Sequence, residues 1–104
     1  MESLRRGRIH IRTQNKTESS AKKTIIADTL GWLLYQKGNL DRAEKLISQA
    51  VNALPQNPQL RYHLGMVYQK QGKKAEARRE LEQALKSQTF PEADDARKAL
   101  NALR

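Results

Sequence analysis

The sequence predicts an all-α chain made of two tandem helix-turn-helix repeats and a C-terminal capping helix. Three observations predict this fold. Apolar residues recur at helical spacing, glycine and proline fall between the apolar segments, and the chain resembles itself when it is shifted by 34 residues. With 104 residues the chain has the usual size of one domain. We therefore expect the repeats to stack in sequence order, each burying one face against the next.

The 34-residue shift aligns six identical pairs between residues 24–57 and residues 58–91. The pairs are Leu30 and Leu64, Gly31 and Gly65, Gly38 and Gly72, Ala43 and Ala77, Gln49 and Gln83, and Ala50 and Ala84. Most of these residues are small. Because small side chains allow two helices to approach closely, the pairs predict packing contacts that occur twice.

The first repeat predicts one helix over residues 24–37 and a second that begins at Leu40. Apolar residues follow a period of about 3.6 residues in both segments, as one buried helical face requires. Gly38 is expected to end the first of these helices. Asn39 is expected to cap the next one with its side chain.

The rest of the chain predicts three more helices, over residues 58–71, 74–87 and 92–103. Pro58 suits the first turn of a helix, because its missing N–H has no partner to lose there. Gly72 is expected to end that helix. The last helix has acidic residues in its first turn, where they favour the helix dipole.

The spacing of these residues resembles the tetratricopeptide repeat, a 34-residue pair of antiparallel helices. The first copy matches at Leu30, Gly31, Leu34, Gly38, Ala43, Ile47, Ala50 and Pro55, and the second at Leu64, Gly65, Tyr68, Gly72, Ala77, Leu81 and Ala84. Three positions depart from the pattern. Ala27 and Arg61 stand where a large residue is usual, and Thr89 stands where proline is usual.

The resemblance covers residues 24–91 and divides the chain into four segments. These are a basic tail expected to be disordered (1–19), a first repeat (20–57), a second repeat (58–91) and a capping helix (92–104). A narrower resemblance, carried by residues 28–32, 38–43, 61–65 and 90–93, is to the last repeats of bacterial proteins associated with exopolysaccharide and exosortase systems.

The family resemblance implies a right-handed superhelix whose concave face is lined by the first helix of each repeat. Carried over position by position, the groove-facing residues include Ile25, Gln36 and Gln59. The partner-binding residues among the groove-facing positions are expected to be Asp28, Trp32, Tyr35, Tyr62, His63, Met66, Gln69 and Lys70. Family members that grip a peptide's terminal carboxylate have Lys and Asn at two concave positions of the early repeats. This chain has Asp28 and Trp32 there in its first repeat, so the charged clamp is absent.

An apolar and aromatic groove is expected in place of that clamp, and its partner is a peptide segment or another protein. Two alternatives stay open at this point. In the first alternative, Trp32 and Met66 pack against a neighbouring helix or a second subunit and bind nothing else. In the second alternative, the groove holds a small molecule. About three repeats are usually needed for a stable array. The two repeats therefore also predict either self-association or derivation from a longer array.

The charge of the chain predicts a second class of function. There are 20 basic and 11 acidic residues, and residues 1–23 hold seven of the former and two of the latter. Such a tail is explained by solvation alone, by contact with nucleic acid or an anionic membrane, or by organelle targeting. The alternative to protein binding is therefore sequence-nonspecific nucleic-acid binding through this tail and a basic helix face, Lys70, Lys73, Lys74, Arg78 and Arg79.

The residues that carry most enzyme chemistry are missing or badly spaced. The chain has no cysteine, which excludes disulfides and thiolate metal sites. His10 and His63 have no acidic residue at metal-ligand spacing, and the adjacent Asp94 and Asp95 point in different directions on a helix. We therefore expect no catalytic role, no cofactor and no metal. Without a membrane span or a secretory signal, a cytoplasmic location is expected.

Overall fold

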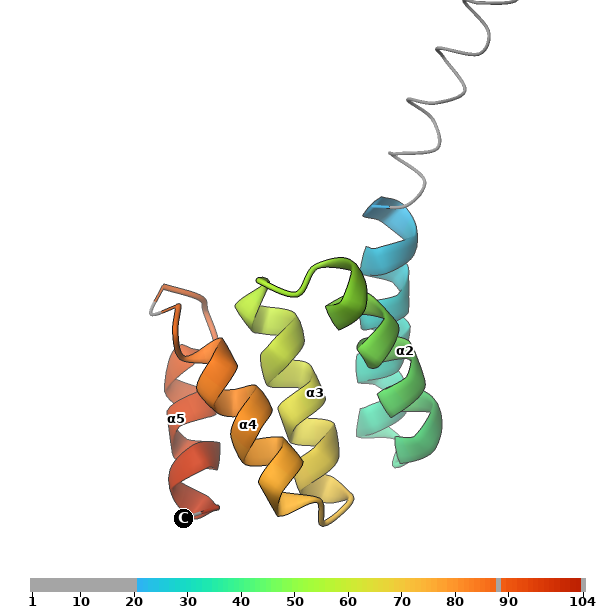
Figure 1. Ribbon diagram of the computed structural model, residues 1–104. Helices are drawn as coiled ribbons and strands as arrows, with labels where there is room; N and C mark the ends of the chain where they lie inside the picture. The colour runs from blue at the N-terminus through green and yellow to red at the C-terminus, as the bar shows by residue number, and fades with distance from the viewer. Residues whose placement is uncertain (1–20, 88, 104) are drawn as a thin grey trace, which may run out of the picture.

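The computed structural model describes residues 21–87 and 89–103, and these form a row of helices that run up and down in chain order (Figure 1). The first helix occupies residues 21–36 of the described part. It is followed by α2 (Leu40–Ala53), α3 (Pro58–Lys70), α4 (Lys74–Ala84) and α5 (Ala93–Ala102). The described residues contain no strand, so the prediction of an all-α fold is confirmed. The predicted tail, residues 1–19, lies outside the described part.

The two helix pairs turn in the same way. Gly38 and Gly72 both have positive φ, at 88° and 82°, a backbone conformation that residues with a Cβ rarely adopt. The N–H after each glycine donates to the carbonyl five residues earlier, from Asn39 to Leu34 at 2.8 Å and from Lys73 to Tyr68 at 2.9 Å. The prediction that these glycines end helices is therefore confirmed.

Two predictions about helix ends are wrong. Asn39 occupies the cap position of α2, but its side chain makes no capping hydrogen bond. The backbone of Asn39, at φ −86° and ψ 77°, lies outside the extended region that a capping residue usually adopts. The predicted helix over residues 74–87 ends at Ala84. The next residues form a tighter turn, in which the Ser87 N–H donates to the carbonyl of Ala84, three residues earlier, at 3.2 Å.

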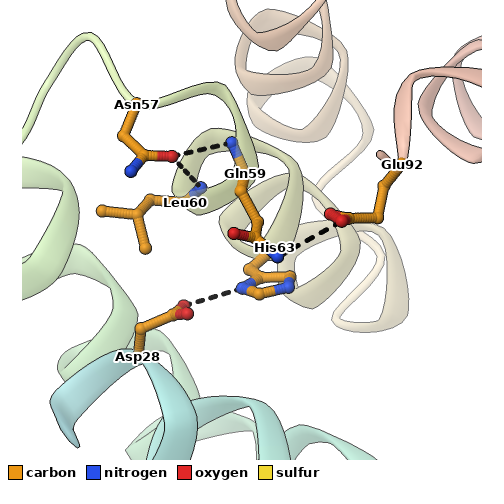
Figure 2. Close-up of polar contacts among 6 residues, drawn as sticks. All are labelled: Asp28, Asn57, Gln59, Leu60, His63 and Glu92. Carbon is orange, nitrogen blue, oxygen red and sulfur yellow. Dashed lines mark hydrogen bonds and ion pairs between the residues drawn. The ribbon is translucent and has the colours of Figure 1, made fainter. Parts of the chain in front are cut away.

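A cap that the sequence analysis did not identify begins α3. The side-chain Oδ1 of Asn57 accepts hydrogen bonds from the backbone N–H groups of Gln59 at 3.0 Å and Leu60 at 3.4 Å (Figure 2). Pro58 occupies the first turn, as predicted. A side-chain cap of this kind satisfies donors that the helix itself leaves open.

The small residues mark close helix contacts, as their repetition predicts. A Cβ added to Gly31 would lie 2.5 Å from Cγ1 of Ile47 on α2. In the second pair, a Cβ added to Gly65 would lie 2.9 Å from Cγ of Leu81 on α4. Both distances are shorter than real side chains allow, so each glycine lets its helix lie directly against its partner.

Two apolar clusters hold the row together. One joins α2 to α3 through Ala43, Ile47, Ala50, Val51, Leu60, Leu64 and Val67. The other joins α3, α4 and α5 through Tyr62, Ala77, Leu81, Ala84, Phe90, Ala93, Ala96, Leu100 and Leu103. Two half-buried side chains, Trp32 and Tyr68, pack against both clusters. The stacking of each helix on the next is therefore continuous through the described residues.

Two of the three departures from the family pattern, Arg61 and Ala27, have different structural consequences. Arg61 donates to Glu80 on α4 at 2.9 Å and to the carbonyl of Pro55 at 3.1 Å, so a polar network replaces a large apolar side chain. Ala27 has no such replacement. It borders a hollow of about 110 Å³ beside Gln49 and Ala50 of α2.

Candidate peptide-binding groove

A hollow of about 460 Å³ lies where the first helix, α3 and the start of α5 meet. Its lining consists of Asp28, Thr29, Trp32, Leu33, Gln59, Tyr62, His63, Glu92 and Asp95. The first helix of each pair therefore contributes to the same depression, together with the segment that begins the last helix. Helical repeats of this kind commonly use such a surface to bind an extended partner.

A polar contact fixes the first helix against α3 at the base of this hollow. Nδ1 of His63 lies 2.7 Å from Oδ1 of Asp28, and both side chains are largely buried (Figure 2). The contact is a hydrogen bond when the ring is neutral and an ion pair when it is protonated. Because it joins the two repeats, it also sets the distance between the two walls of the hollow.

Aromatic rings form the wall between these helices. Trp32 stacks on His63 at a centroid distance of 4.1 Å and on Tyr35 at 4.6 Å, and Tyr62 lies 6.1 Å away with its ring tilted. His63 and Tyr62 are buried, whereas Trp32 keeps part of its surface open to solvent. The partly open indole offers a flat apolar surface that is already held in place by its neighbours.

Carboxylates surround the opposite side of the hollow. Oε1 of Glu92 accepts a hydrogen bond from Nε2 of Gln59 at 3.2 Å (Figure 2). The other oxygen, Oε2, is buried and has no partner among the described residues. Burial raises the pKa of the Tyr62 phenol, and the nearby carboxylates of Asp95 and Glu92 raise it further. The hollow is therefore a site of negative potential in a chain with a net charge of +9.

The structure brings half of the predicted binding residues into this hollow. Asp28, Trp32, Tyr62 and His63 line it. The others lie along the adjoining surface: Nζ of Lys70 lies 4.6 Å from the ring centroid of Tyr35, Met66 packs against the α3–α5 cluster, and Gln69 is half-buried. No observation tests whether any of them binds a partner, so their role stays a prediction.

Sequence reasoning missed four residues of the lining: Thr29, Leu33, Glu92 and Asp95. The two acids were explained by the helix dipole alone, and Asp95 does lie in the first turn of α5. Glu92 instead holds the cap position and bonds to α3. No local pattern carried this information, because it depends on where α5 packs.

Three residues of the predicted basic face, Lys70, Lys73 and Arg78, make contacts within the chain. Lys73 donates to Glu44 of α2 at 3.1 Å, and Arg78 donates to the carbonyl of Leu103 at 3.0 Å. Lys70 lies over the Tyr35 ring. No observation on the described residues supports the nucleic-acid alternative.

The described part of the chain holds neither a candidate metal cluster nor a candidate membrane span. No group of three acidic or histidine side chains is arranged so that it could hold a metal ion. No described helix is long and apolar enough to cross a membrane.

Two stacked helix pairs with the same turns and the same glycine contacts define an α-helical repeat protein. The family model of the tetratricopeptide repeat matches residues 34–100, and the chain belongs to this family. No curated protein matches the chain. Tetratricopeptide repeats generally mediate protein–protein interactions and are typically non-catalytic scaffolds. The narrower bacterial resemblance stays a prediction.

Proposed function

We propose that the chain is a non-catalytic interaction module that binds a segment of a partner protein in the hollow between the first helix, α3 and α5. The segment carries a basic side chain next to an apolar one. The apolar side chain packs on Trp32, and the basic side chain lies among the carboxylates of Glu92 and Asp95.

The observation that carries this proposal is that the carboxylate residues Glu92 and Asp95 line the hollow beside Trp32. A guanidinium or ammonium group in the hollow would form charge-assisted hydrogen bonds with these carboxylates. A basic group next to Trp32 and Tyr62 also gains from contact with the aromatic faces. An acidic segment would meet three carboxylates, counting Asp28, and is disfavoured.

The test is a panel of fluorescein-labelled nonapeptides that share a Gly/Ser background with a central Xaa-Leu pair, where Xaa is Arg, Lys, Gln or Glu. We expect anisotropy titrations to rank Arg and Lys above Gln, and Gln above Glu. Since each lost charge contact is worth about 1–2 kcal/mol, the separation between Arg and Gln should be roughly tenfold in Kd. Equal affinity across the panel contradicts the preference for a basic segment.

Adjacent aspartates provide a matched control. Asp95 lines the hollow, whereas Asp94 is not part of that lining and pairs with Arg97 at 2.6 Å. Asp95→Asn should lower the affinity for the Arg peptide about tenfold. Asp94→Asn removes the same charge from the same helix turn and should leave that affinity unchanged. Equal losses in the two variants would show that only overall charge matters.

A further inference from the structure

The first helix carries an apolar stripe that stays about half-exposed in the described part of the chain. It consists of Ile26, Leu30 and Leu33, spaced four and three residues apart, so the three side chains share one helix face. Their exposed fractions are 63%, 42% and 49%. We call this set the outer stripe.

The second repeat shows what normally covers such a stripe. A shift of 34 residues brings the outer stripe onto Leu60, Leu64 and Val67 of α3, whose exposed fractions are 5%, 4% and 0%. These three side chains pack on α2. The same positions are therefore an interior surface in one repeat and an open surface in the other.

The opposite end of the row is closed by polar residues. The exposed face of α5 carries Asp94, Asp95, Arg97, Lys98 and Asn101, while its apolar side chains face α4. A head-to-tail contact between two copies would press the outer stripe against this charged face. Pairing the outer stripe with itself instead places apolar side chains against apolar side chains.

We propose that the outer stripe is the interface of a homodimer, in which the first helices of two copies pack on each other about a two-fold axis. Residues 1–20 are a poorer occupant, because their only apolar members are Met1, Leu4, Ile9 and Ile11, too few for a face like that of α2. In a two-fold dimer the middle residue of the stripe, Leu30, lies near its own counterpart. The interface is a single stripe on each copy, so the dimer is weak and depends on concentration.

The first experiment is sedimentation equilibrium of the full chain over roughly 1–500 µM, at low and high salt. We expect the average mass to rise from 11.9 kDa toward twice that value, with a midpoint of about 10–100 µM. High salt should strengthen the dimer, because it screens repulsion between two chains of charge +9. A monomer throughout the range overturns the proposal.

Paired charge variants test the two-fold arrangement. Leu30→Glu and Leu30→Lys should each be monomeric, and an equimolar mixture of the two should associate again because the opposite charges meet. Circular dichroism establishes that each variant is folded. The matched control is Leu54→Glu, since Leu54 has a similar exposed fraction of 46% but lies at the end of α2, off the stripe. Variants that still dimerise alone, or a mixture that stays monomeric, overturn the proposal.

The Leu30 variants test the dimer without changing a residue that lines the proposed peptide site. Leu33 belongs to both the outer stripe and the lining of the hollow, whereas Leu30 is not part of that lining. Loss of the dimer in the Leu30 variants with peptide binding retained would separate the two surfaces.

Discussion

The two repeats share the same internal contacts but differ in what lies outside them. Gly31 against Ile47 corresponds to Gly65 against Leu81, and the two glycine turns have nearly equal φ angles. The outer stripe of the first helix is exposed, whereas the equivalent residues of α3, Leu60, Leu64 and Val67, are buried against α2. The comparison shows that a helical repeat is stabilised mostly by its neighbours, and that its sequence alone does not say whether a neighbour is present.

The largest difference between the repeats should appear at equivalent leucines. Leu64→Ala leaves a cavity in the cluster on α2 and should lower the free energy of unfolding by about 2–4 kcal/mol. Leu30→Ala removes a half-exposed side chain and should cost less than about 1 kcal/mol. Urea denaturation at low protein concentration measures both, because association then contributes little. Equal losses would mean that the outer stripe is covered within one chain.

The glycine contacts should respond alike in the two repeats. Gly31→Ala and Gly65→Ala each force a Cβ into the facing helix, and each should destabilise the chain by about 1–3 kcal/mol. Thermal unfolding of both variants measures this. If either variant is more stable than the wild type, the neighbouring side chain has moved aside, and the higher helix propensity of alanine dominates.

Filling the hollow beside Ala27 with a larger side chain should strengthen the packing of the first helix on α2, where the second repeat uses the polar contacts of Arg61 instead. Ala27→Leu places apolar atoms against Gln49 and Ala50 and should stabilise the chain by about 1 kcal/mol. Ala75→Leu, at an exposed position of α4, is the control and should change stability little. A loss of stability in Ala27→Leu would show that the hollow is too narrow for the larger side chain.

The smallest expected effect concerns the ion pair between Glu44 and Lys73. Burial raises the pKa of Glu44, but hydrogen bonds from Gln71 and Lys73 outweigh this and lower it below 4.5. The folded-state pKa is depressed, so the stabilisation is complete above pH 4.5 and is lost as the pH falls through the lower value. The difference in the free energy of unfolding between wild type and Glu44→Gln should therefore become smaller as the pH is lowered. An unchanged gap between pH 7 and pH 3 would contradict this.

The sequence predicted those features that depend on residues close to one another or on strict periodicity. The helix ends at Gly38 and Gly72 follow from backbone preferences, and the close contact at Gly31 follows from a repeated small residue. The role of Glu92 could not be predicted, because its bond to Gln59 spans 33 residues and depends on where α5 packs. The expected side-chain cap at Asn39 is not formed because its ψ of 77° lies outside the extended region usual for a capping residue, whereas the capping Asn57 has a ψ of 113°.

Trp32 and Tyr68 each pack against both apolar clusters, and this has a consequence for how the chain melts. In a row of repeats, the ends can fray while the middle stays folded, because each unit contacts only its neighbours. Here two aromatic side chains are shared, so loosening one cluster removes contacts from the other. We expect the helices to unfold in one cooperative transition, with coincident changes in circular dichroism and in the fluorescence of the single tryptophan.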